Sequence, residues 1–351
     1  MITDNLTTAV YFSDLLPKKC PTLNQHIAEV LEANGIPYAY LSETKDIWCR
    51  DFMPIQIAED RFVFYKYTPG YLQDPKAIRL QTNPETVFQA PQNRLQSVLQ
   101  NAITIDLVLD GGNVVKCDNI VVMTEKVFAE NKDKTRTEVE RILKDAFQSE
   151  ILFLPWDRKE TFGHSDGIVH YAGNGRILLT NYDDNSLYYY RRFRKALEKH
   201  FEVIPLNYDV KKPHASSWAY INFLQIGKLI LVPQLGLKED KQALEQINNA
   251  MPDCEVLGIP ALEAVRRGGG LNCISWNTTT LQDNIFEESI IGQTNIQQAP
   301  DAHGLLECAE CYEHGIGCEP NLTKAERWYT IAANQGYKEA QEKLKDLQKR
   351  K

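Results

Sequence analysis

The stretch GHSDGIVHYAGNGRILLT, residues 163–180, decides the fold. Two apolar-rich segments in it flank Gly173-Asn174-Gly175, and a Gly/Asn cluster between such segments is typical of a β-hairpin turn. Residues 187–200 follow with helical periodicity, and residues 203–205 form a further short apolar segment. This order predicts a unit made of a hairpin, a helix and a closing strand.

The same order of signals recurs along the chain. The units begin near positions 48, 110, 163, 218 and 271, at intervals of roughly 50 to 60 residues, a period typical of propellers and arrays. The last unit lacks its helix, and the N-terminal segments 9–12, 23–31 and 36–41 supply the missing strand, helix and strand. The pattern predicts a closed ring of five α/β units. The alternative is an ordinary α/β domain whose βαβ units recur by chance.

The unit starts carry chemically reactive side chains, which a ring would bring to one place. They read Trp48-Cys49-Arg50-Asp51, Asp110-Gly111-Gly112-Asn113, Gly163-His164-Ser165-Asp166, Trp218 to Asn222, and Gly268-Gly269-Gly270-Leu271-Asn272-Cys273. A His, two Asp and a Cys at equivalent points indicate a catalytic site more than a structural feature.

His164 and Asp166 are two residues apart, so on a strand both side chains project to the same side. Cys273 follows three glycines, which permit close backbone approach and leave a thiol accessible. For each residue the alternative is structural: a hydrogen-bonded core histidine, or a buried cysteine. We keep the structural interpretation for Cys20, Cys117 and Cys254, and we expect Arg50, unlike Asp51, to be structural.

Composition places limits on the function. The chain has 351 residues, 43% of them hydrophobic and 25% charged, with a formal net charge of −8. The negative charge argues against nucleic acid as the main partner and suits a cationic ligand. We find no signal peptide and no apolar run of membrane-spanning length. The eight cysteines are scattered, as expected of reduced thiols, so the sequence predicts a cytoplasmic protein.

At its unit starts the sequence resembles the agmatine deiminase and bacterial-type peptidyl-arginine deiminase family. The resemblance covers roughly residues 1–285 and rests on the Gly-His-x-Asp and Gly-rich-to-Cys motifs in combination. It implies a five-bladed, pseudo-symmetric α/β propeller of the pentein type, which we place at residues 1–290. It also implies an enzyme that hydrolyses a guanidinium group to a ureido product and ammonia through a covalent Cys amidino intermediate.

The resemblance also implies roles for individual residues. Cys273 is the expected nucleophile and His164 the general acid/base, while Asp51 and Asp166 bind the guanidinium. Further candidates for substrate binding are Trp48, Asp110, Asn113, Asn222 and Gly270. No metal or organic cofactor is expected, and the expected partner is a small cationic guanidino compound.

The substrate is left open by two departures from agmatine deiminases. Many of them carry Glu before the Gly-Gly pair, where this chain has Asp110, and their aromatic, Gly-rich segment is replaced by residues 64–71. Agmatine, on a route to putrescine, peptidyl or free arginine, and another guanidino compound therefore all remain candidate substrates. The same residues are also compatible with an amidinotransferase, a cysteine protease or a non-catalytic scaffold.

From about Pro300 the character of the chain changes. We expect helices at 304–315, 322–336 and 337–347, and the small and aromatic face of the second resembles a tetratricopeptide-like repeat of the Sel family. Residues 300–351 are thus expected to form a short all-α repeat that packs on the ring, on another subunit or on a protein partner. Cys308 and Cys311 form an incomplete zinc motif, and we expect them to fill packing gaps.

Overall fold

The computed structural model describes residues 1–75, 77–95, 98, 101–209, 216–279, 306, 309–310, 312–314, 322–334 and 337–349. Their strands form five three-stranded sheets. The sheets are β15-β1-β2 (Ser275–Thr278, Ala9–Ser13, Tyr38–Leu41), β3-β4-β5 (Ile55–Ala58, Arg61–Lys66, Ala102–Val108), β6-β7-β8 (Val115–Cys117, Ile120–Thr124, Glu150–Leu154), β9-β10-β11 (Val169–Gly173, Arg176–Leu179, Glu202–Pro205) and β12-β13-β14 (Leu224–Ile226, Leu229–Gln234, Glu255–Pro260).

Each sheet has the same internal order. Its first two strands in the repeat are antiparallel, and the second and third are parallel. A parallel pair needs a crossover connection, which the intervening helix supplies in most units. The expectation that the N-terminus completes the last unit is confirmed: Ala9 pairs with Thr278 across β1 and β15, and Val10 pairs with Tyr38 across β1 and β2.

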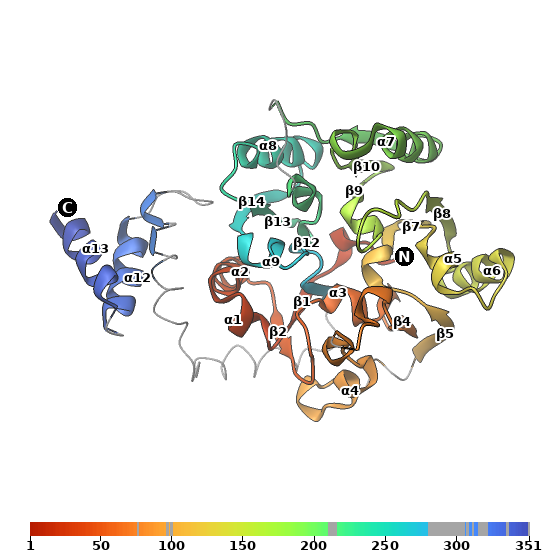
Figure 1. The fold of residues 1–351 in the computed structure, drawn as a ribbon, viewed down its shortest axis with the longest axis horizontal. Helices are drawn as coiled ribbons and strands as arrows, with labels where there is room; N and C mark the ends of the chain where they lie inside the picture. The colour runs from red at the N-terminus through yellow and green to blue at the C-terminus, as the bar shows by residue number, and fades with distance from the viewer. Residues whose placement is uncertain are drawn as a thin grey trace.

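The sheets follow one another around the main body in chain order, and the longer helices lie at its periphery (Figure 1). The α-helices of this body are α1 (Leu16–Lys19), α2 (Pro21–Ala33), α3 (Cys49–Phe52), α4 (Pro84–Gln89), α5 (Lys126–Glu130), α6 (Arg136–Phe147), α7 (Asp183–Leu197), α8 (Asp240–Ala250) and α9 (Leu262–Val265). The sequence also predicts a helix at residues 95–99, and most of these residues lie outside the described ones.

Helix α6 illustrates how the sequence sets an element. Thr135 and Glu138 form a capping box: Oγ1 of Thr135 accepts from the backbone N–H of Glu138, and the Glu138 carboxylate accepts from the N–H of Thr135 at 2.7 Å. Val139, Leu143 and Phe147, at helical spacing, are buried against the sheets. Gln148 then adopts a left-handed conformation and ends the helix.

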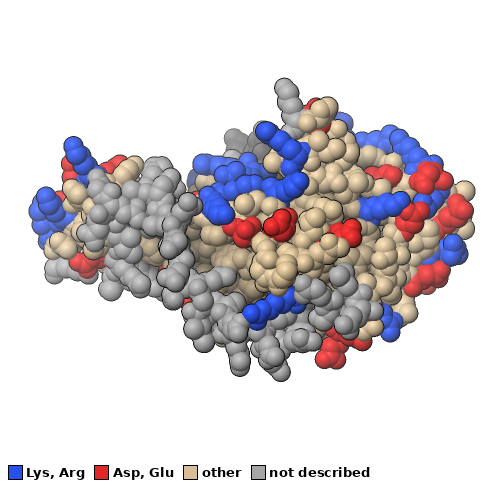
Figure 2. Space-filling view, turned by 90° about the horizontal axis from the view of Figure 1, so that it is seen from below, with Lys and Arg blue, Asp and Glu red and all other residues tan. Residues whose placement is uncertain are grey.

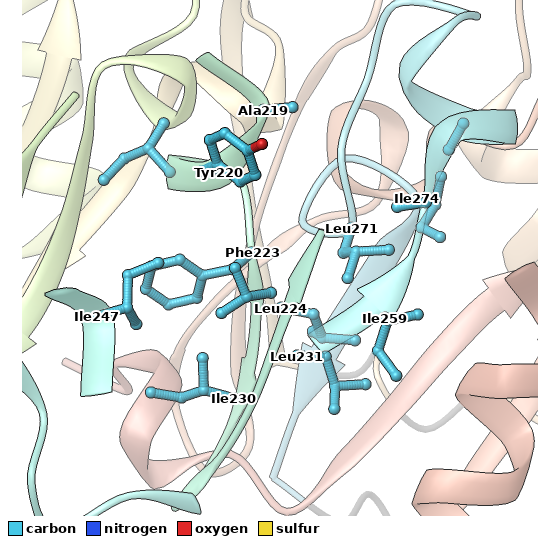
Figure 3. Packing of buried hydrophobic residues seen from close by; sticks show 14 of the residues in the cluster. Ala219, Tyr220, Phe223, Leu224, Ile230, Leu231, Ile247, Ile259, Leu271 and Ile274 are labelled. Atoms are coloured by element: carbon cyan, nitrogen blue, oxygen red, sulfur yellow. The ribbon is translucent and has the colours of Figure 1, made fainter. Parts of the chain in front are cut away.

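The core is divided into clusters that lie between neighbouring sheets. Figure 3 shows one of them, where side chains of β12, β13, β14 and α8 pack with Leu271 and Ile274, which precede β15. Leu271 and Ile274 are both fully buried. The segment that carries Cys273 is therefore anchored on both sides by apolar burial.

At one side of the body lie α12 (Leu322–Asn334) and α13 (Lys338–Lys349) (Figure 1). They have a core of their own, which includes Trp328, Tyr329 and Leu347. Tyr312 Oη donates to Oε2 of Glu29 on α2 at 2.7 Å, so the C-terminal segment contacts the main body. Cys308 and Cys311 lie outside the described residues.

Surface charges of both signs are interspersed on the described residues of the face in Figure 2. A nucleic-acid-binding face would instead concentrate Lys and Arg. Among the described helices, none combines the length and the apolar character needed to cross a bilayer.

Candidate active site

Short 3₁₀ and α-helical turns at the starts of the units hold the reactive side chains. Besides α3 these are η6 (Gly111–Asn113), η7 (Ser165–Gly167) and η8 (Ser217–Ile221). The expectation that His164 and Asp166 lie together on a strand is wrong: His164 is extended and caps η7, and Asp166 lies within that turn. The turn forms because Ile168 and Ser165 close a backbone hydrogen bond at 3.0 Å before β9 begins.

Three of these turns, α3, η7 and η8, meet at a cavity of about 520 Å³, which Cys273 also lines. Its aromatic lining consists of Trp48, Tyr71, Trp156, Phe162, Tyr182, Tyr189 and Trp218. Its polar lining includes Asp51, Asp157, Lys159, Glu160, His164, Asp166, Asn222 and Cys273. Among the described lining residues, four carboxyl groups thus face one lysine and one histidine, which gives the cavity an acidic character suited to a cationic ligand.

Cys273 lies between α9 and β15 and is held through its backbone. Its N–H donates to Oδ1 of Asn222 at 3.1 Å, and its Sγ lies 3.7 Å from Oδ2 of Asp166. Burial, together with the charges of Asp166 and Asp51, raises the pKa of the Cys273 thiol well above its usual value. In the ligand-free site the sulfur is therefore a thiol.

Gly270 explains how this segment comes so close to its neighbour. A Cβ at this position would lie 2.7 Å from the backbone oxygen of Asn222, which also accepts a hydrogen bond from the N–H of Asn272 at 3.0 Å. Gly270 does not line the cavity; it lets the Cys273 segment approach η8.

His164 lies between two acids. Its Nε2 is 2.9 Å from Oδ2 of Asp110, and its Nδ1 is 3.6 Å from Oδ1 of Asp51. Burial disfavours the charged imidazole, but the Asp51 charge and the hydrogen bond to Asp110 raise the pKa of His164 to about 9. His164 is therefore an imidazolium at neutral pH and can donate a proton.

Two acids of the cavity lining contact the reactive groups: Asp51 lies beside His164, and Asp166 lies beside Cys273. Oδ1 of Asp51 accepts from the N–H of Gly112 at 3.0 Å, and Oδ2 of Asp166 accepts from Nδ2 of Asn272 at 2.8 Å. Burial and the charges of neighbouring acids raise the pKa of Asp51 to about 6. Arg50, as expected, is structural, because its guanidinium contacts Asn272 O and Asn277 Oδ1.

Asp110 and Asn113, expected to bind substrate, do not line the cavity. Asp110 is 1% exposed, and its Oδ2 contacts both His164 and Lys126. Oδ1 of Asn113 accepts from the backbone N–H groups of Thr124 and Ser165, which ties η6 to η7 and β7. Both side chains bind other residues of the protein, so they position His164 and the turns around the cavity and do not face the ligand space.

Six residues that the sequence predicted for the site line one cavity: Trp48, Asp51, His164, Asp166, Asn222 and Cys273. Other residues in and around the site were missed. Lys126 and most of the aromatic lining were not predicted. The one available signal was position: Lys126 follows Thr124 at the end of β7, and residues 156–162 precede the His164 motif directly.

The fold and the site define an α/β protein with a thiol, an imidazole and acids around one cavity. The chain belongs to the Porphyromonas-type peptidyl-arginine deiminase family, which its residues 20–278 match.

A relative from Lactococcus lactis subsp. lactis, described as "Putative agmatine deiminase", is 28% identical over 209 residues, 49% of this chain and 57% of the relative. The chain thus spans little more than half the length of that relative. Among solved structures, C. jejuni agmatine deiminase matches with a TM-score of 0.62 and 18% sequence identity. The match covers 80% of this chain and 96% of the C. jejuni chain. Agmatine deiminase of Enterococcus faecalis has a TM-score of 0.60 at 19% identity, with coverages of 79% and 94%. At these identities the likeness is one of fold.

Proposed function

We propose that this chain is a hydrolase that converts a guanidinium group into a ureido group and ammonia, with agmatine as its substrate. The observation that carries the proposal is the meeting of Cys273, His164, Asp51 and Asp166 at one acidic cavity. Membership of a deiminase family and the name of the Lactococcus relative support the same chemistry.

Binding follows from charge and shape. A guanidinium is planar and cationic, and carboxylates hold its N–H groups by directional, charge-assisted hydrogen bonds. Asp51 and Asp166 take this role, and the aromatic lining encloses the rest of the ligand. Two acids on separate turns fix the central carbon of the guanidinium in front of Cys273.

The cation also activates the nucleophile. The pKa of the Cys273 thiol is high because the thiol is buried among acids. A positive charge placed beside the sulfur therefore lowers this pKa. The thiol proton leaves to solvent, and the Cys273 thiolate attacks the guanidinium carbon to give a tetrahedral adduct. His164 then donates its proton to one nitrogen, the C–N bond breaks, and ammonia departs.

An amidino thioether on Cys273 remains. Neutral His164 now takes a proton from water, and the resulting hydroxide adds to the same carbon. The C–S bond breaks, and the hydroxyl proton of the adduct passes to the departing Cys273 sulfur, which restores the thiol. The ureido product carries the new oxygen. Every proton and electron pair in this sequence is supplied by the substrate, water and the residues named.

The charged lining favours agmatine over free arginine. Lys159 is the one Lys or Arg among the described lining residues, against four acids. The carboxylate of free arginine would meet more negative than positive charge, whereas agmatine carries no carboxylate. Lys66 of β4 is paired with Asp106 and does not line the cavity. Peptidyl-arginine, which also lacks the α-carboxylate, is the second candidate.

An assay of ammonia release over agmatine, free arginine and arginine-containing peptides tests this proposal. We expect agmatine to give the highest kcat/KM. Turnover of peptides alone would move the assignment to peptidyl-arginine, and a product that forms only with added amine would indicate an amidinotransferase. Absence of turnover on every guanidine would support a non-catalytic scaffold.

For the architecture, we propose that the five sheets form a five-bladed pentein-type propeller, that residues 1–290 are the catalytic domain, and that residues 300–351 form a Sel-type repeat. The separate core of α12 and α13 supports the division. A location in the cytoplasm and a place in putrescine biosynthesis complete the proposal, because agmatine is an intracellular amine and its ureido product is a carbamoylated diamine.

A further inference from the structure

Lys126 is a buried ammonium beside the site that the chemistry above does not use. It is the first residue of α5, its side chain is 7% exposed, and it does not line the cavity. Lysine is almost never buried unless it is paired, because desolvation of the ammonium is costly. The role of Lys126 must therefore be sought in the groups that its ammonium contacts.

Those groups belong to the site. Nζ of Lys126 contacts Oδ2 of Asp110, lies 3.1 Å from Oε1 of Glu130, and lies 3.4 Å from Nε2 of His164. It also lies 5.7 Å from the centre of the Tyr71 ring, and Tyr71 Oη donates to Oδ2 of Asp51 at 3.4 Å. Lys126 thus contacts Asp110, one of the two acids that flank His164, directly, and it is connected to the other, Asp51, through Tyr71.

One oxygen connects Lys126 to the imidazole. Oδ2 of Asp110 accepts from Lys126 and from Nε2 of His164, while Oδ1 of Asp110 is buried and has no hydrogen-bond partner among the described residues. The ammonium therefore fixes which carboxylate oxygen faces His164. A general acid/base is commonly oriented by a third group in this manner.

We propose that Lys126 is a positioning residue, whose ammonium holds Asp110 against Nε2 of His164 and so directs Nδ1 of the imidazole toward Asp51. The catalytic consequence rests on the proposed function, because a guanidinium nitrogen bound by Asp51 then lies next to Nδ1. Asp110 is thereby withdrawn from substrate binding.

The charge of Lys126 has a consequence of known sign. The charged groups that face His164 are Asp51 from α3, Asp110 from the segment before η6, and Lys126 from α5, with Glu130 beyond Lys126. The two acids raise the pKa of His164, and Lys126 lowers it. Loss of the charge alone would therefore raise the pKa of His164, whereas release of Asp110, whose hydrogen bond raises this pKa more strongly, would lower it.

Titration of His164 by NMR in the full chain tests this without any need for turnover. If the ammonium holds Asp110, Lys126→Met should lower the His164 pKa by about one unit, and Lys126→Arg should leave it close to the wild-type value. A rise would mean that Lys126 acts only as a neighbouring charge, and it would contradict the proposal. Lys116→Met is the matched control, because Lys116 is equally buried and pairs with Asp4 but does not touch His164. A His164 pKa that Lys126→Met leaves unchanged would overturn the proposal.

Glu130→Gln provides a second variant should Lys126→Met fold poorly. It keeps the ammonium but removes the carboxylate that shares it, so the ammonium should turn fully to Asp110 and the His164 pKa should stay within a few tenths of a unit. A fall as large as that expected for Lys126→Met would mean that the ammonium does not hold Asp110, and the proposal would fail.

Kinetics separate this inference from the proposed function. If the wild-type chain releases no ammonia from any guanidine, the function fails and the NMR titration still decides the role of Lys126. If it is active, Lys126→Met should lower kcat about 10- to 100-fold with a smaller change in KM, and Lys126→Arg should recover part of kcat. Equal losses of activity in Lys126→Met and Lys116→Met would mean a merely structural role and would contradict the proposal.

Discussion

Sγ of Cys273 lies 3.7 Å from Oδ2 of Asp166, so the sulfur of the proposed nucleophile contacts a carboxylate. This arrangement differs from a protease triad, in which a histidine deprotonates the nucleophile directly. A thiol beside an acid is a poor nucleophile until a cation arrives. The pair therefore couples nucleophile activation to the binding of a positively charged substrate.

Substitution of Asp166 by Asn should weaken binding and catalysis together. The amide keeps the size of the side chain but loses the charge that binds the guanidinium, and its own donors face Nδ2 of Asn272. We expect kcat/KM for agmatine to fall at least about 100-fold, with KM raised and kcat lowered. Steady-state ammonia release measures both, and an unchanged kcat/KM would remove Asp166 from the site.

Agmatine affinity should depend on pH through Asp51. Its pKa is raised to about 6, so Asp51 becomes neutral as the pH falls through that value and the bound cation loses a partner. In a Cys273→Ala background, which cannot turn over, calorimetry should show affinity that is constant above this pH and falls up to about tenfold per unit below it. In the double variant that also carries Asp51→Asn the fall should vanish. If it persists there, another group titrates.

Gly112 should tolerate no side chain. A Cβ there would lie 2.6 Å from Oδ1 of Asp51 and 2.6 Å from Nδ1 of His164, so both groups would have to move. We expect Gly112→Ala to lower kcat/KM at least about tenfold, since small displacements of catalytic groups are costly. Gly70→Ala is the control, because its methyl group meets nothing within 4 Å. Equal activities of the two variants would speak against the packed arrangement of Asp51 and His164.

A chain that ends at residue 290 should keep its ammonia-releasing activity. Every described residue that lines the cavity lies between Trp48 and Cys273, and α12 and α13 pack around their own core. The deletion removes the Tyr312 contact with Glu29, so we expect a lower melting temperature with kcat/KM within about threefold. Complete loss of activity in a folded truncated chain would contradict the division into domains.

Much of this arrangement could be predicted from the sequence because the hairpin turns, helical faces and closing strands are local signals. The completion of the last unit by β1 also followed from a missing helix after Cys273. The convergence of Asp51, His164, Asp166 and Cys273 could be inferred because equivalent positions of a repeat meet at one place.

Other features could not be predicted because they depend on contacts between distant segments. The sequence does not distinguish a strand from a 3₁₀ turn at Ser165–Gly167, and alternation alone suggested the strand. The roles of Asp110 and Asn113 depend on which neighbours take up their polar atoms. Lys126 was missed because lysine is usually exposed, and only the three-dimensional arrangement places it between Asp110 and Glu130.

Covalent catalysis by Cys273 can be tested by intact-mass spectrometry of the chain, quenched with acid during turnover of agmatine. We predict an adduct equal to agmatine less ammonia, located on Cys273, that decays as the ureido product accumulates. It should be absent from Cys273→Ala, which should also lose at least about 1,000-fold in ammonia release, and present in the control Cys254→Ala, whose thiol does not line the cavity. Ammonia release by Cys273→Ala at the wild-type rate would contradict covalent catalysis by Cys273.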